Sequence, residues 1–120
     1  MKNVLNDQSR GVYQGKIFVK QEAQKTDAYQ LSKALLLNDN AEFNAKPELE
    51  IYADDVKCSH GSTTGQLDEE AVFYLRSRGL SEKAAKELLV KAFLGEVLEE
   101  VDHVEVRSYV EDQIEKHFSA

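Results

Sequence analysis

The chain has 120 residues, of which 42% are hydrophobic and 31% charged, and 15 Lys and Arg against 22 Asp and Glu give a formal net charge of -7. This acidity argues against nucleic acid as a partner, because phosphate contacts need clustered cations, and no apolar run approaches the roughly 20 residues of a membrane span. The single cysteine, Cys58, excludes an intramolecular disulfide framework and is typical of a reducing, cytoplasmic compartment.

Short apolar segments separated by turn formers predict β-strands in the first half of the chain. The segments are 11–13, 16–19, 29–37 and 49–53, and the turn formers between them include Gly15, residues 38–40 and Lys46-Pro47. The apolar centres Ile17, Leu35 and Ile51 are 18 and 16 residues apart, which suits the stacked coils of a β-solenoid. A meander of antiparallel strands explains the same residues as well, so the pattern leaves both architectures open.

The best internal boundary lies around residues 65–67, because charge and pattern both change there. Residues 1–66 hold 8 Lys and Arg and 9 Asp and Glu, a net of -1, whereas residues 67–120 hold 7 and 13, a net of -6. The Gly-Ser-Thr-Thr-Gly run at 61–65 is interpreted as a flexible junction between the two parts. The acidic helical part is either simply solvated or complements a basic partner.

Capping signals predict three helices in the second half. The first begins after an N-cap at Asp68 and stops at Gly79, and the second, over residues 82–100, is capped by Ser81. The third has an apolar stripe that consists of Val106, Tyr109, Val110, Ile114 and Phe118.

The first predicted helix carries two aromatic residues away from its inner stripe. Ala71, Val72 and Leu75 form that stripe, and Phe73 and Tyr74 point a quarter-turn or more from it. The two rings are therefore either exposed for a partner or packed against the strands.

Cys58 and His60 form the one constellation that can carry chemistry. Two residues apart, their side chains lie on the same side of an extended strand and can face one metal or cluster. A closed zinc site needs four ligands, however, and His103 and His117 are distant in the sequence. A nucleophile pair would need an orienting third group and a pocket, and nothing in the sequence identifies either. The residues favour a scaffold over an enzyme, with a stand-alone metal- or cluster-binding module at Cys58 and His60 as the alternative.

Two long runs carry a resemblance to a known family. Residues 49–61, which include Lys-Cys-Ser-His-Gly, and residues 64–79 closely resemble the SufB/SufD family of iron–sulfur cluster assembly factors, and Lys-Cys-Ser-His-Gly resembles its SufD branch. Residues 11–17 and 22–28 look like the family's last β-helical coils, and residues 93–98 look like its helical tail. The chain matches only the C-terminal part of such proteins, as an expressed fragment would. A fragment of this kind bares strand edges, so self-association or loose packing is expected at residues 10–37.

The resemblance implies an α+β fold, with the last coils of a right-handed parallel β-helix at 1–66 and a small C-terminal helical domain at 67–120. It implies a non-catalytic scaffold in a SufB–SufC–SufD complex, in which the β-helix pairs with SufB and the helical tail docks on the SufC ATPase, where ATP is bound. A transient iron–sulfur cluster would form at the SufB–SufD interface, near His60 and Cys58, and the chain alone would hold no metal or cofactor stably. The candidate residues for ATPase docking are Phe73, Tyr74, Arg76, Arg78 and Phe93.

Overall fold

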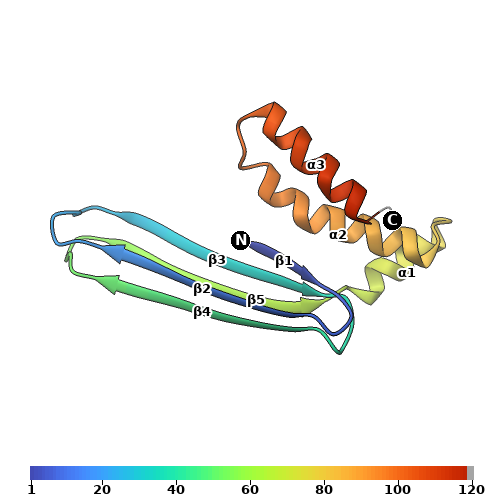
Figure 1. The fold of residues 1–120 in the computed structure, drawn as a ribbon, viewed down its shortest axis with the longest axis horizontal. Coiled ribbons are helices and arrows are strands. Elements are labelled where there is room, and N and C mark those ends of the chain that lie inside the picture. The colour runs from blue at the N-terminus through green and yellow to red at the C-terminus, as the bar shows by residue number, and fades with distance from the viewer. Residues whose placement is uncertain (119–120) are drawn as a thin grey trace. The chain divides into compact units, whose positions relative to one another are not determined.

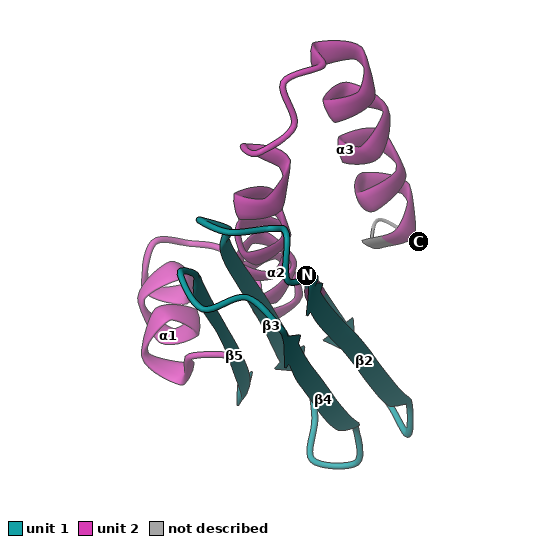
Figure 2. Ribbon diagram, turned by 90° about the vertical axis from the view of Figure 1, so that its left-hand side faces the viewer, with its two compact units in different colours: residues 1, 3–65 teal, residues 2, 66–120 magenta. Residues whose placement is uncertain are grey.

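The computed structural model describes residues 1–118, which form five β-strands followed by three α-helices (Figure 1). The arrangement is of the α+β class that was predicted. The chain divides into two compact units, one of residues 1 and 3–65 and the other of residue 2 and the residues from 66 onward (Figure 2). The elements are β1 (Lys2–Leu5), β2 (Arg10–Val19), β3 (Asp27–Leu36), β4 (Glu42–Ile51), β5 (Lys57–Gln66), α1 (Glu69–Ser77), α2 (Glu82–Leu98) and α3 (Val104–Phe118).

The strands alternate along the chain between two sheets. One sheet has the order β1-β3-β5 and the other contains β2 and β4 (Figure 1). β2 and β4 are parallel and paired along their whole length, from Arg10 opposite Glu42 to Val19 opposite Ile51. This parallel pairing across a long crossover excludes the antiparallel meander that the sequence pattern left open.

β2 is one strand, although the sequence pattern predicts two segments with a turn at Gly15. Its side chains alternate strictly between half-buried and exposed from Arg10 onward, and Val19 at its end is buried. Gly15 does not turn the chain. A side chain at this position would collide with the amide of Gln30 and the ring of Tyr13, so glycine leaves room for two larger groups.

β4 contains Pro47, which the sequence pattern assigns to a turn, and that prediction is wrong. The Glu42 N–H donates to the Ser9 carbonyl and the Tyr52 N–H to the Val19 carbonyl, at 3.0 and 2.9 Å. In a parallel ladder alternate residues point their backbone groups to the same neighbour, so the even-numbered residues of β4 bond to β2. Pro47 falls on the other set, where its missing N–H costs the ladder nothing.

β5 occupies residues that the sequence pattern assigns to a flexible junction. The run from Gly61 to Gly65 is extended and lies inside the strand. A run so rich in Gly and Ser has a low local propensity for strand. Pairing with β3 outweighs this low propensity, because the sheet supplies hydrogen bonds to the backbone. β1 likewise has no counterpart among the predicted segments.

The core of the strand unit lies between the two sheets and is built from small and medium side chains. Leu5, Ala34 and Ala41 are buried in one cluster, and Leu36 and Phe43 pack against it half-buried.

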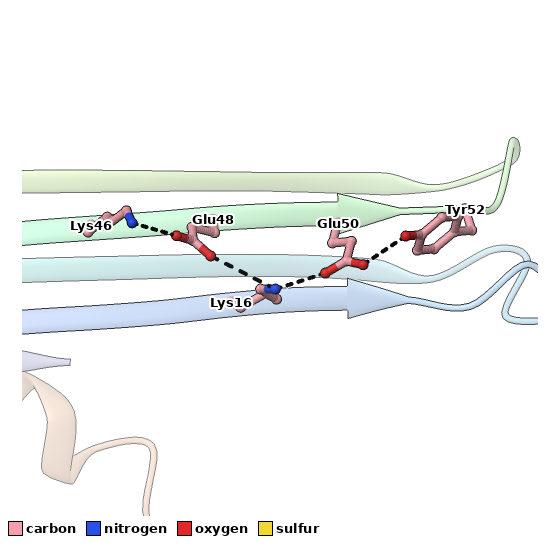
Figure 3. Close-up of polar contacts among 5 residues, drawn as sticks. All are labelled: Lys16, Lys46, Glu48, Glu50 and Tyr52. Atoms are coloured by element: carbon pink, nitrogen blue, oxygen red, sulfur yellow. Dashed lines mark hydrogen bonds and ion pairs between the residues drawn. The ribbon is translucent and has the colours of Figure 1, made fainter.

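A line of charged and polar side chains joins β2 and β4 on their outer faces (Figure 3). Lys16 Nζ lies 2.8 Å from Glu50 and 4.0 Å from Glu48, Lys46 lies 3.1 Å from Glu48, and Tyr52 donates to Glu50 at 2.8 Å. The hydrogen bond from Lys16 lowers the pKa of Glu50, and the hydrogen bond from Lys46 lowers that of Glu48.

The helix caps lie where the sequence predicts them. The Asp68 side chain accepts hydrogen bonds from the N–H groups of the first turn of α1, and the Ser81 side chain accepts one from Ala84 in α2. Gly79 has a φ of 100°, the left-handed conformation that ends a helix at little cost only in glycine. α2 stops at Leu98, two residues before its predicted end.

The inner side of α3 differs from the predicted apolar stripe. Val110 and Ile114 are half-buried as expected, but Val106 and Tyr109 are exposed, and Arg107 is half-buried with its guanidinium donating to the Val101 carbonyl at 2.7 Å. The side chain of Phe118, the last member of the predicted stripe, lies outside the described part of the chain. None of the helices within residues 1–118 is long and apolar enough to cross a membrane.

Candidate functional site

Cys58 and His60 lie two residues apart on β5. Because side chains alternate along a strand, both project from the same face. Cys58 is half-buried and His60 is exposed. The lone thiol is free.

β5 lies beside β3 in a register that two observations define. The Lys57 N–H donates to the Thr26 carbonyl at 2.9 Å, which aligns the first residues of the two ten-residue strands. A side chain at Gly61 would lie 3.3 Å from Leu31, as expected when these two residues are neighbours in a parallel ladder. Residue pairs in the two strands therefore follow this alignment throughout.

The same register places His60 next to Gln30, with both side chains on one face of the sheet. Gln30 points toward the second sheet, since its amide fills the space above Gly15 of β2. The Gln30 Nε2 donates to the Tyr13 Oη at 2.6 Å. His60 therefore projects from the face that turns toward the β2–β4 sheet, beside a fixed amide.

The exposure of His60 has a topological cause. β5 is the third strand of its sheet, whereas the sheet opposite ends at β4, so within residues 1–118 no strand covers the inner face of β5. The inner face of β4 is open in the same way: Ile51 is 37% exposed, although its ladder partner Val19 is 3% exposed. We call the surface formed by Leu49, Ile51, Cys58 and His60 the open end.

Sequence reasoning finds Cys58 and His60 but misses the side chains around them. Gln30 and Tyr29 carry no motif, and only the register between β3 and β5, thirty residues apart, brings them to β5. Tyr13 belongs to the other sheet and contacts Gln30. Tyr29 is at the outer face, where its hydroxyl would lie 3.1 Å from a side chain at Gly61. Inside, the Ser32 hydroxyl is fully buried and has no hydrogen-bond partner in the described structure.

The donor groups in the described part of the chain do not assemble a complete metal site. Within residues 1–118 no group of three or more His, Cys, Asp and Glu side chains is placed to hold one ion. His103 directly precedes α3 and His117 lies in its last turn, both in the helical unit. The stand-alone metal-binding module therefore gains no support from the arrangement of these residues.

A second candidate surface lies on α1 and its C-cap residue, and we call it the α1 patch: Phe73, Tyr74, Arg76 and Arg78. Phe73 is 73% exposed and Tyr74 56%, which leaves two large rings in solvent on one short helix. The Arg78 guanidinium lies 5.2 Å from the centre of the Tyr74 ring, and Arg76 lies 3.8 Å from Glu82. Phe93, the other predicted docking residue, is half-buried on α2.

Comparison with known proteins identifies the family. The family model described as SUF system FeS cluster assembly, SufBD core domain, matches residues 1–93. The chain belongs to the SufBD family. The matched residues include the open end and the whole of α1, and the resemblance predicted from the sequence is thereby confirmed.

Curated relatives of this SufBD chain are named for iron–sulfur cluster assembly. It is 49% identical over 100 residues to a SufBD family protein of Synechocystis and 48% identical over 98 residues to the SufD protein of Escherichia coli. Protein ABCI7, chloroplastic, of Arabidopsis thaliana is 40% identical over 114 residues. These matches cover 83%, 82% and 95% of the chain but 22%, 23% and 23% of the relatives, so the chain spans about a quarter of their length.

Proposed function

We propose that this SufBD chain is a non-catalytic scaffold component of a cytoplasmic SufB–SufC–SufD complex for iron–sulfur cluster assembly. The helical unit binds the SufC ATPase through the α1 patch, and the strand unit pairs with SufB at the open end. The nascent cluster is cargo that passes between subunits, and ATP belongs to SufC.

The observation that carries the proposal is the exposure of Phe73 and Tyr74 on α1. A helix of nine residues gains little from holding two large rings in water. Clustered aromatic and Arg side chains are also the residue types that contribute most binding energy at protein interfaces. A docking role explains why both occur together, with Arg76 and Arg78 in the adjacent turn.

The strand unit supports the second half of the proposal. We infer that its alternating strands are the last coils of a right-handed parallel β-helix, since each crossover returns the chain to a parallel strand in the same sheet. Such a β-helix stops at the open end, where apolar Leu49 and Ile51 are exposed beside Cys58 and His60. Iron–sulfur clusters need more ligands than these two residues supply, so the remaining ligands come from SufB.

Calorimetric titration of the purified chain with SufC tests the proposal. We expect saturable binding, and Phe73→Ala with Tyr74→Ala weakens it at least tenfold, about 1.4 kcal/mol, because two interface rings are removed. The matched control is Tyr109→Ala, which removes an equally exposed ring from α3 and leaves the affinity unchanged. If SufC does not bind, or if both variants lose affinity equally, the assignment to α1 is wrong.

A further inference from the structure

A groove of about 230 Å³ lies between α2 and α3, the two longer helices of the helical unit (Figure 1). The residues that line it are Lys91, Gly95 and Leu98 on α2 and Glu111, Ile114 and Glu115 on α3. Leu98 is buried and Ile114 is half-buried, whereas both glutamates are exposed. The groove therefore has an apolar inner part and a charged rim.

Gly95 contributes open space to this groove. A side chain built at this position would have no atom of the described chain within 4 Å. Gly95 is not among the described residues with positive φ, so neither its backbone conformation nor a close neighbour requires glycine here. Glycine is also one of the least favourable residues inside a helix. What glycine does provide is access, because a group that enters the groove can lie directly against the α2 backbone.

The rim contains one carboxylate that is paired and one that is not. Lys91 Nζ lies 3.1 Å from Glu115 Oε1, and this ion pair joins the two helices. Glu111 lies one helical turn before Glu115, a rise of about 5.4 Å, and no ion pair within residues 1–118 involves it. Residues 67–120 carry a net charge of -6, so their field attracts a cationic group to this rim.

We propose that the groove between α2 and α3 is a docking site for an arginine side chain of a partner protein. The alkyl part of the arginine packs against Leu98, Ile114 and the backbone at Gly95, and its guanidinium pairs with the Glu111 carboxylate. Arginine fits better than lysine, because a planar guanidinium donates two parallel hydrogen bonds to one carboxylate and is more weakly hydrated than an ammonium group. No residue of the α1 patch or of the open end lines the groove, so the inference goes beyond the proposed function.

Titration of the 120-residue chain with N-acetylarginine amide, followed by nitrogen–proton correlation spectra, tests the site directly. We expect saturable shifts of the backbone amides of Gly95, Leu98 and Glu111. The dissociation constant should be in the millimolar range, because one free side chain lacks the rest of an interface. N-acetylcitrulline amide has nearly the same shape without the charge and should bind about tenfold more weakly. The corresponding lysine amide has the charge without the planar fork and should fall between the two.

Matched variants separate the groove from the acidic surface as a whole. Glu111→Gln should weaken arginine binding about tenfold, whereas Glu105→Gln makes the same change on α3 outside the groove and should leave it unaltered. Gly95→Leu fills the groove and should abolish saturation, whereas Ala92→Leu adds a bulky side chain to α2 outside the groove and should not. Helical circular dichroism shows whether Gly95→Leu folds. If it does not, Glu111→Gln decides the question, since it removes only a charge from an exposed side chain.

The proposal is overturned if arginine shifts none of the groove amides, or if the citrulline or lysine amide binds as tightly. Equal losses in Glu111→Gln and Glu105→Gln would also overturn it, because they would show non-specific attraction to an acidic surface. Sedimentation tests the other possible occupant: a wild-type dimer that Glu111→Gln dissociates would assign the groove to an arginine of a second copy and contradict the proposal. None of these measurements requires SufC or SufB. A negative result here and a negative SufC titration are therefore distinguishable, because the titration tests α1 and the amide shifts test α2 and α3.

Discussion

Lys16 forms its shortest ion pair with Glu50, at 2.8 Å, although its partner in the strand ladder is Glu48, at 4.0 Å. The contact is diagonal because Lys46 engages Glu48 from its own strand at 3.1 Å and Lys16 reaches the next carboxylate along (Figure 3). Lys16, Lys46, Glu48 and Glu50 thereby form one network of ion pairs across β2 and β4.

This arrangement predicts a loss of stability in acid. The pKa of Glu50 is lowered, first by the hydrogen bond from Lys16 and then by that from Tyr52, and the pKa of Glu48 is lowered first by Lys46. Folding therefore favours the ionised carboxylates. Their contribution is present above the ordinary value of 4.5 and is lost as the pH falls through the lowered folded-state pKa.

Urea unfolding as a function of pH checks this expectation. Lys16→Gln should flatten the acid dependence of the free energy of unfolding, while Lys20→Gln, just beyond β2, should keep the wild-type dependence. Because Lys16 is exposed and the two carboxylates are only half-buried, salt screens the interaction and the effect is small at high salt. Identical acid profiles for Lys16→Gln and the wild-type chain would show that the Lys16–Glu50 pair contributes nothing.

Gly11→Ala is expected to destabilise the strand unit by about 1–3 kcal/mol, because added volume in a packed core forces side chains out of place. A methyl group at Gly11 would lie 2.8 Å from Leu5 and 2.9 Å from the ring of Phe43, both part of the core. Gly65→Ala is the control, since no atom lies within 4 Å of the added carbon, and its effect should stay within about 0.5 kcal/mol. Equal urea midpoints for the two variants would contradict the packing described for Gly11.

Gly79→Ala and Gly95→Ala are expected to change the stability of the helical unit in opposite directions. Gly79 has positive φ, so a side chain there costs about 1–2 kcal/mol. Gly95 lies inside α2 with open space around it, and alanine there should stabilise the helix by about 0.5–1 kcal/mol. Thermal unfolding followed by helical circular dichroism measures both, and a shift of the same sign in the two variants would refute the expectation.

Helix boundaries were predictable because their causes are local. The caps at Asp68 and Ser81 and the stop at Gly79 act within a few residues of themselves. The rotation of α3 about its own axis could not be predicted in the same way, because the packing of α3 against α2 determines which of its residues face inward. Arg107 takes an inner position that an apolar pattern cannot assign.

Strand boundaries depended on partners far away in the sequence. Pro47 is a turn former in isolation, but in β4 its position falls where no ladder bond is needed. Residues 61–65 have weak strand propensity and extend because β3 offers them hydrogen bonds.

In the candidate site, too, the features that depend on local sequence were predictable and those that depend on distant strands were not. The two-residue spacing of Cys58 and His60 is enough to predict a shared face. Their neighbour Gln30 is a common polar residue in an unremarkable segment, and nothing local links it to His60. The exposure of Phe73 and Tyr74 was one of two open alternatives, and only the structure decides between them.

Pro47 also makes the two sheets differ in the backbone hydrogen-bond donors that their last strands offer to an added strand. The backbone positions of β4 that do not bond to β2 include Pro47 near the middle, so a strand added there loses a donor in the centre of its ladder. On β5 the corresponding positions include Cys58 and His60, and within residues 1–118 that row contains no proline and has no partner strand. A strand paired with β4 on that side would therefore lack one hydrogen bond at Pro47, whereas no position of β5 would impose such a loss.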